Sequence, residues 1–164
     1  MVFSLFISDK ADEALGNKST FTAGGYDLDK FAKGQTLTWN PLTDTDFWRV
    51  DLEKVVIGDV KVITSTDSAI IDSGTSFIAM PETDLDSLVL LLDSVHNIPC
   101  TWDENLSGGQ YVCTCPDDVE GDVANLPSLK ITLSKTNTYE LPLSELIMKE
   151  KDAGCYLAVM DLGA

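Results

Sequence analysis

The sequence is poor in basic side chains, has a single histidine and contains no long apolar run. Lysine and arginine number 11 against 27 aspartates and glutamates, giving a formal net charge of −16 at pH 7. Such a charge repels nucleic-acid phosphates, so we expect no nucleic-acid partner. No stretch of about 18 uncharged apolar residues occurs, so we expect no membrane span. The excess of carboxylates fits either an ordinary acidic surface or adaptation to an acidic compartment, where many of them are neutral.

The four cysteines, Cys100, Cys113, Cys115 and Cys155, are better explained by disulfides than by a metal. Their number is even, and no second cysteine pair at zinc-finger spacing accompanies them. The one histidine, His96, lies at the end of a predicted helix, where a surface or capping role is expected. We therefore predict two disulfides, no metal site and an oxidising compartment.

Length and hydrophobic pattern predict one mostly β domain with one long helix. The chain has 164 residues, of which 44% are hydrophobic, enough to build a core. Apolar residues recur at helical spacing after Pro81, which predicts a helix at about residues 81–95. Polar and glycine-rich composition predicts a loop over residues 97–122. Short apolar or alternating runs predict strands over residues 2–7, 37–39, 47–57, 60–64, 129–134, 139–141 and 155–160, with a short helix at 144–148.

The pattern that points to chemistry is Ala-Ile-Ile-Asp-Ser-Gly-Thr-Ser at residues 69–76. A carboxylate directly after a buried-type strand is costly unless it is hydrogen-bonded or titrates. Gly74 lets the backbone approach the Asp72 carboxylate, and the hydroxyls of Ser73 and Thr75 can orient or anchor the loop. An ordinary turn is the alternative interpretation, because Asp, Ser and Gly are common turn formers.

This string resembles the active-site motif of pepsin-like aspartic proteases, in which two apolar residues precede Asp-Thr/Ser-Gly-Thr/Ser. Further segments resemble the second half of these enzymes, in the same order along the chain. They are Val-Phe-Ser-Leu-Phe-Ile-Ser at 2–8, Phe-Thr-Ala-Gly-Gly-Tyr-Asp at 21–27, Leu-Thr-Trp-Asn-Pro-Leu at 37–42, Phe-Trp-Arg-Val at 47–50, Leu-Pro-Ser-Leu-Lys-Ile at 126–131, Tyr-Glu-Leu-Pro at 139–142 and Gly-Cys-Tyr-Leu-Ala-Val-Met at 154–160. The resemblance covers essentially the whole chain and implies a mainly all-β, β-barrel-like lobe.

The resemblance implies an aspartic endopeptidase in which each of two lobes contributes one aspartate and the pair shares a proton. The ionised aspartate acts as general base on a bound water and the protonated one polarises the scissile carbonyl, without a metal or other cofactor. Asp72 would be the catalytic carboxylate of this lobe. Ser73 would tie the two active-site loops together, Gly74 would present backbone groups, and Thr75 would hydrogen-bond Asp72. The implied substrate-binding residues are Ser76, Phe77, Ile70, Phe47 and Met160.

For Phe47, Ile70 and Met160, plain core packing is the alternative to substrate contact. The resemblance also implies a disulfide between Cys115, which follows a Tyr-Val-type strand, and Cys155. This pairing leaves Cys100 and Cys113 for the second disulfide, across a loop short and glycine-rich enough to close. Cys113 in place of Cys115 is the alternative partner of Cys155.

Residues 1–164 would thus form the carboxy-terminal lobe of a two-lobe enzyme, incomplete at its carboxy terminus. The amino-terminal lobe, and an apolar-apolar-Gly segment that braces the aspartate loop, would lie outside this sequence, so the chain alone would be inactive. The implied partners are a peptide or protein substrate and the missing lobe. The implied compartment is the secretory pathway, with the protein secreted or in an acidic vacuole or lysosome. Two alternatives remain: an inactive binding or decoy module, and a single-lobe protease working as a homodimer.

Overall fold

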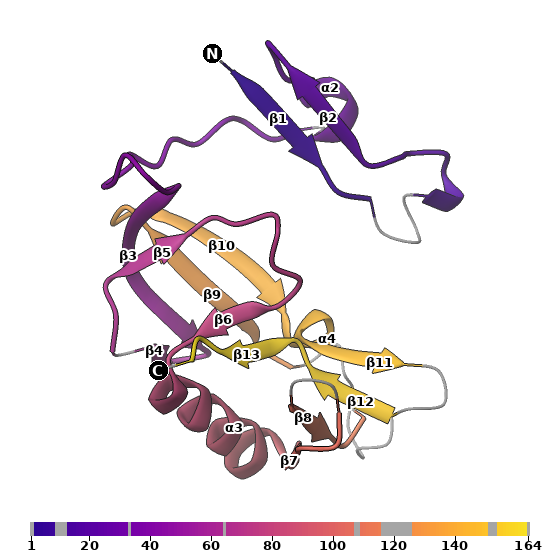
Figure 1. Ribbon diagram of the computed structural model, residues 1–164, viewed down its shortest axis with the longest axis vertical. Helices are drawn as coiled ribbons and strands as arrows, with labels where there is room; N and C mark the ends of the chain where they lie inside the picture. Colours follow the sequence, from indigo (N-terminus) through magenta and orange to yellow (C-terminus); the bar gives the residue numbers. More distant parts are fainter. Residues whose placement is uncertain are drawn as a thin grey trace. The chain divides into compact units, whose positions relative to one another are not determined.

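The computed structural model describes residues 2–8, 13–32, 34–63, 65–106, 109–115, 126–150 and 154–163. The chain divides into two compact units, Met1–Trp39 and Asn40–Ala164. Strands outnumber helices among the described residues (Figure 1), which confirms the prediction of a mainly β fold.

The first unit is built on a two-stranded antiparallel sheet of β1 (Phe3–Phe6) and β2 (Thr20–Ala23), followed by the short helix α2 (Leu28–Phe31). Gly24, whose φ is +87°, ends β2 and donates its N–H to the Val2 carbonyl oxygen at 2.7 Å. A left-handed φ of this kind is favourable for glycine alone among common residues, so Gly24 closes the sheet at this end.

The two faces of this hairpin differ in how well they are covered. On one face, the ring of Phe6 stacks on the ring of Phe31, with centroids 4.5 Å apart. On the other face lie Phe3, Leu5 and Phe21, because strand side chains alternate and Leu5 pairs in register with Phe21. These three are exposed by 42%, 50% and 64%. A two-stranded sheet is marginally stable by itself, so a further element on this apolar face would stabilise the hairpin.

The described residues of the second unit form three sheets (Figure 1). The strands are β3 (Arg49–Ile57), β4 (Val60–Ile63), β5 (Ser68–Ile70), β6 (Ile78–Met80), β7 (Cys100–Asp103), β8 (Gln110–Cys113), β9 (Ser128–Leu133), β10 (Asn137–Pro142), β11 (Ile147–Glu150), β12 (Gly154–Leu157) and β13 (Val159–Asp161). One sheet has the order β10-β9-β3-β4, with β5 also paired to β3. The second has the order β11-β12-β8-β7, and the third pairs β13 with β6.

The longest strand, β3, follows the predicted alternation at its start. Val50 and Leu52 are buried, whereas Asp51 and Glu53, which alternate with them, are exposed. The alternation changes after Glu53, because the register against β9 shifts between Leu52 and Lys54. The β3–β4 hairpin turns at Gly58, which has a φ of +57°.

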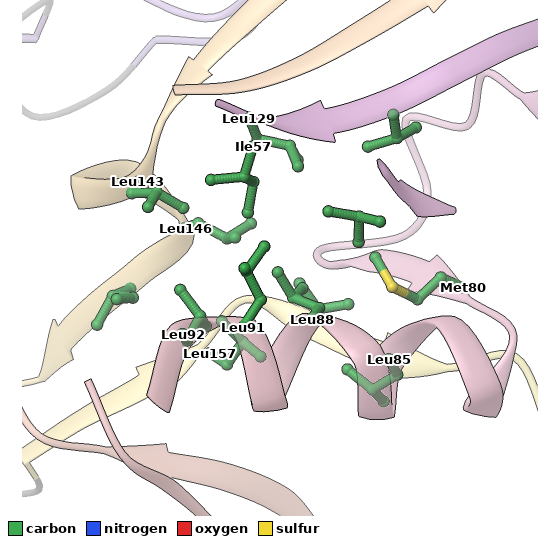
Figure 2. Packing of buried hydrophobic residues seen from close by; sticks show 14 of the residues in the cluster. Ile57, Met80, Leu85, Leu88, Leu91, Leu92, Leu129, Leu143, Leu146 and Leu157 are labelled. Carbon is green, nitrogen blue, oxygen red and sulfur yellow. The ribbon is translucent and has the colours of Figure 1, made fainter. Parts of the chain in front are cut away.

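The long helix α3 (Glu82–His96) begins one residue later than predicted, with Pro81 as its N-cap. Four of its five leucines point into the core, where they meet residues of β3, β9 and the short helix α4 (Leu143–Leu146) (Figure 2). The helix ends where Asn97 adopts a left-handed conformation and the Ile98 N–H donates to the Leu92 carbonyl oxygen at 2.9 Å. The core residues of α3 are Asp84, Leu85, Leu88, Leu91 and Leu92.

Several predicted elements differ from those observed. Residues 37–39 form no strand, and the predicted loop 97–122 contains the β7–β8 hairpin; residues 107–108 and 116–122 of that loop lie outside the described part. The disulfide between Cys100 and Cys113 fixes this hairpin despite its polar composition. The strand predicted over 155–160 is interrupted at Ala158, whose N–H donates to the Leu146 carbonyl oxygen instead of to a neighbouring strand.

A buried carboxylate joins α3 to the bend between β4 and β5. Asp84 is 1% exposed, and its Oδ2 accepts hydrogen bonds from the hydroxyl and, at 3.4 Å, from the backbone N–H of Ser65. β4 and β5 both pair with β3. The bend between them therefore determines how the chain enters β5. The end of β5 leads directly to the loop that carries Asp72.

Candidate active site

Residues 71–77 form the loop between β5 and β6, and partners distant in sequence hold both of its ends. At one end, the Ile71 N–H donates to the Trp48 carbonyl oxygen at 2.9 Å, which extends the β3–β5 pairing. At the other end, the Ile78 N–H donates to the Ala158 carbonyl oxygen at 3.1 Å, where β6 pairs in parallel with β13. The loop is therefore anchored by two separate sheets.

The Asp72 carboxylate accepts two hydrogen bonds within this loop. The Thr75 hydroxyl donates to Oδ2 at 2.6 Å, and the Gly74 N–H donates to Oδ1 at 2.8 Å. Both bonds stabilise the ionised form and hold the pKa of Asp72 below its ordinary value, the Thr75 bond contributing most, against a small opposing effect of burial. The side chain stays exposed to solvent, so this is an ionised carboxylate in a fixed orientation that water can reach.

Glycine at position 74 permits the close approach of the backbone to this carboxylate. A Cβ atom at Gly74 would lie 3.2 Å from Oδ1 of Asp72. Such a contact is tighter than ordinary van der Waals packing, so any larger residue would push the carboxylate away from the Gly74 N–H. The close approach expected from the sequence is therefore present, and a side chain at position 74 would require the carboxylate to shift by a few tenths of an ångström.

The remaining residues of the motif lie on the same loop but differ in environment. Ser73 and Ser76 are exposed, whereas Phe77 is partly buried. The ring of Phe77 meets the ring of Tyr156 edge-on, with centroids 6.2 Å apart. The roles of Ser73 in tying two loops together, and of Ser76 and Phe77 in substrate contact, remain predictions.

The three other predicted substrate-binding residues are exposed in this chain. Phe47, Ile70 and Met160 are 56%, 49% and 42% exposed, so core packing within this chain does not explain them. The structure places Ile70 opposite Arg49 on β3 and Met160 opposite Ala79 on β6, so both lie on strands next to the Asp72 loop.

The prediction of a buried run before Asp72 is wrong for its last two residues. Ile70 is half exposed, and Ile71 is 58% exposed; the first ends the short strand β5 and the second begins the loop. Trp48, which the sequence reasoning did not single out for the site, is 54% exposed and its carbonyl oxygen bonds Ile71. The sequence feature that could have indicated Trp48 is its position next to Phe47, which makes two adjacent aromatic residues.

An ion pair holds the segment that precedes β3. Nη1 of Arg49 lies 3.0 Å from Oδ2 of Asp44, and the Arg49 guanidinium lies 5.9 Å from the centroid of the Phe47 ring. The Asp46 N–H also donates to the Asp44 carboxylate at 2.9 Å; this bond and, more weakly, Arg49 keep the pKa of Asp44 below its ordinary value. The sequence reasoning missed this pair, because it joins residues that show no periodic pattern.

The two disulfides pair as predicted, Cys100 with Cys113 and Cys115 with Cys155. The described residues contain no group of three or more histidine, cysteine, aspartate or glutamate side chains placed to hold a metal ion. No helix among them is long and apolar enough to cross a bilayer.

Comparison with known proteins decides the family. The family model described as "Eukaryotic aspartyl protease" matches residues 1–163. The chain belongs to this family. Cathepsin E of Mus musculus is 34% identical over 144 residues, which are 86% of the chain and 32% of that protein. Cathepsin E-B of Xenopus laevis is 26% identical over 156 residues, 94% of the chain and 34% of that protein.

Two further comparisons extend the likeness to fungi and to a solved structure. A probable vacuolar protease A of Trichophyton verrucosum is 29% identical over 136 residues, 83% of the chain and 30% of that protein. The crystal structure of an aspartic proteinase from Irpex lacteus matches with a TM-score of 0.63 at 22% identity, over 88% of the chain and 41% of that structure. The chain thus has the fold of this family and spans about a third of the length of these relatives.

Proposed function

We propose that this chain is one lobe of an acid endopeptidase and that Asp72 supplies one of the two carboxylates of its active site. The observation that carries the proposal is the Asp72 carboxylate, held by the Gly74 N–H and the Thr75 hydroxyl on an open loop. Membership of the aspartyl protease family supports the reaction, hydrolysis of a peptide bond by an activated water.

Asp72 is suited to the role of the ionised carboxylate. Its two hydrogen bonds favour the charged form, which is the form that can remove a proton from a water molecule. The reaction also needs a protonated carboxyl group to polarise the scissile carbonyl, and the proposal assigns that group to a second lobe. Activity therefore requires one ionised and one protonated carboxyl group, which gives a pH profile displaced towards acid.

Exposed apolar side chains support the idea of a partner lobe and a peptide substrate. In the second unit, Phe47, Trp48, Ile70, Ile71 and Met160 are each at least 42% exposed on elements that flank the Asp72 loop. The first unit carries its own exposed apolar face on the β1–β2 hairpin. Apolar groups gathered in this way usually mark a surface that another molecule or segment covers.

The compartment we propose is the secretory pathway, with the protein secreted or delivered to an acidic vacuole or lysosome. Two disulfides fit an oxidising site of folding. One relative carries the name vacuolar protease, and an acidic vacuole would supply the low pH that a half-protonated carboxyl pair needs.

The test compares cleavage of an unfolded protein substrate at acid pH by the complete two-lobe protein and by its Asp72→Asn variant. General acid–base assistance contributes on the order of 10²–10⁴-fold in rate, so we expect a loss of at least this size. The control is Asp93→Asn, an exposed carboxylate on α3, which should cleave normally. Thermal melting should be alike for all three proteins.

Near wild-type cleavage by an Asp72→Asn variant that melts normally would show that Asp72 is only a turn residue. Complete protein that binds peptides without cleaving them would favour a binding or decoy module. The 164-residue chain alone is expected to be inactive. Cleavage by this chain that rises with the square of its concentration when dilute would favour a homodimeric protease.

A further inference from the structure

We propose that Cys100 is a modification site for small thiols such as glutathione. Attack at Cys100 releases Cys113, which then forms a new disulfide bond with Cys155. This inference is independent of the proteolytic function and concerns only the sheet β11-β12-β8-β7 (Figure 1).

Three of the four cysteines lie in one row across three adjacent strands. Cys100 on β7 lies opposite Cys113 on β8, and Cys113 lies opposite Cys155 on β12. Directly opposite residues of antiparallel strands point to the same face, with Cα atoms about 4.5–5.5 Å apart. Disulfides span Cα separations of roughly 4.4–6.8 Å. Cys113 therefore has two possible partners in register, Cys100, to which it is bonded, and Cys155.

The four residues differ in access to solvent. Cys113, Cys115 and Cys155 are 6%, 7% and 1% exposed, whereas Cys100 is only partly buried and lies on β7, the edge strand of its sheet. An attacking thiolate must reach the sulfur with which it reacts. A dissolved thiol therefore attacks the Cys100 sulfur, and Cys113 is the thiolate that is displaced.

The second step is an internal exchange that conserves atoms and electrons. Attack by a thiolate RS⁻ forms a mixed disulfide on Cys100 and frees Cys113 as a thiolate. This thiolate attacks the sulfur of Cys155 across the β8–β12 pair, forms a Cys113–Cys155 bond and displaces Cys115, which takes up a proton. One thiol is consumed, one is formed and the number of disulfide bonds is unchanged, so no oxidant is needed.

The exchange changes which strand is covalently held. The chain at the end of β8 remains joined to β12, through Cys113 of β8 in place of Cys115 just after it, while β7 loses its cross-link to β8. Cys100 is the first residue of β7, which follows α3 after a short connection. Modification at Cys100 therefore loosens the segment after α3 and leaves the β8–β12 connection intact.

The test exposes the oxidised full-length chain to graded ratios of reduced glutathione to glutathione disulfide, followed by acid quenching, alkylation and fragmentation mass spectrometry. We expect glutathione on Cys100 and alkylation of Cys115 to appear together in equal amounts, with Cys113 unalkylated. Glutathione on Cys115 or Cys155, or alkylation of Cys113 with Cys115 protected, overturns the proposal. So does a chain that gains no glutathione before both disulfides are fully reduced.

Two single variants separate the transfer from direct attack on the second disulfide. In Cys113→Ser, glutathione disulfide should modify Cys100 while Cys115 stays unalkylated, because no thiolate is released opposite Cys155; alkylation of Cys115 at the wild-type level contradicts the transfer. In Cys115→Ser, the Cys155 thiol lies opposite Cys113, so alkylation should be shared between Cys155 and Cys100. Alkylation of Cys155 alone in that variant contradicts the proposed exchange. Circular dichroism of each variant checks that the fold is kept.

Discussion

The Thr75 hydroxyl lies 2.6 Å from Oδ2 of Asp72, so a neighbour on the same loop both orients this carboxylate and favours its ionised form. The relationship is local in sequence, since the two residues are three positions apart. It also makes the protonation of Asp72 sensitive to a single hydroxyl group.

Replacing Thr75 by Val should raise the pKa of Asp72 towards its ordinary value, because the hydroxyl is the larger of the two causes that lower it. Carboxyl carbon chemical shifts followed by NMR across an acid titration of the chain measure the change. Thr75→Ser keeps a hydroxyl and should titrate like the wild type. An unchanged pKa in Thr75→Val would show that the Gly74 N–H alone sets the ionisation.

The same shift predicts a pH dependence of stability. Because the folded-state pKa of Asp72 is lowered, its contribution to stability is present above the unfolded pKa and is lost as pH falls through the folded pKa. The wild type should therefore be more stable than Thr75→Val at neutral pH, and the difference should shrink in acid. Urea unfolding of both proteins at several pH values measures this; a difference that grows in acid would contradict the assignment.

Replacing Gly74 by Ala should weaken the bond from the residue 74 N–H to Asp72, because the new Cβ would lie 3.2 Å from Oδ1. We expect the pKa of Asp72 to rise and cleavage by the complete protein to fall, with little change in melting temperature. Ser73→Ala, on the same exposed loop, is the comparison for pKa. Normal activity in Gly74→Ala would mean that the loop moves aside without consequence.

Leu88 and Leu90 lie on the same helix but in opposite environments, so their truncation should have different effects. Leu88 is 0% exposed and Leu90 is 66% exposed. Leu88→Ala should reduce the free energy of unfolding by about 2–5 kcal/mol through lost burial and a cavity, whereas Leu90→Ala should be nearly neutral. Chemical denaturation of the two variants decides the matter, and equal losses would show that α3 packs by a different face.

Removing a disulfide should cost more stability when the loop it closes is longer, although the cost rises only with the logarithm of loop length. The Cys115–Cys155 bond spans 40 residues and the Cys100–Cys113 bond spans 13. Loop entropy gives losses of about 4 and about 3 kcal/mol for the paired Cys→Ser variants. Denaturant unfolding should therefore rank the variant lacking Cys115 and Cys155 as the less stable; the reverse order would indicate that native contacts outweigh chain entropy.

Local sequence patterns predicted the elements whose apolar residues repeat at a regular spacing or whose ends are marked by turn-forming residues. Leu85, Leu88 and Leu92 repeat at helical spacing, and all three are buried in α3. Val95 fits the same spacing but is 62% exposed, because α3 is already near its end at Asn97. Periodicity identifies a helix more reliably than it identifies which of its terminal residues have something to pack against.

Pairings between distant segments could not be read from the sequence. β6 and β13 are too short to show a period, and the Ala158 break between β12 and β13 depends on Leu146 and Ile78, which bond its two backbone groups. The Asp72 motif itself was recognisable because its residues are adjacent in the chain. The exposure of Ile70 was not, because it depends on which distant residues pack over that face of β5.

The parallel pairing of β6 with β13 also sets an order of events during synthesis. Parallel strands cannot be joined by a tight turn, and β13 lies close to the end of the described chain. A growing chain emerges amino terminus first, so Asp72, Gly74 and Thr75 leave the ribosome long before the strand that fixes β6. The loop that carries Asp72 is thus completed late, and a nascent chain halted before Val159 would carry the whole motif without the strand that holds β6.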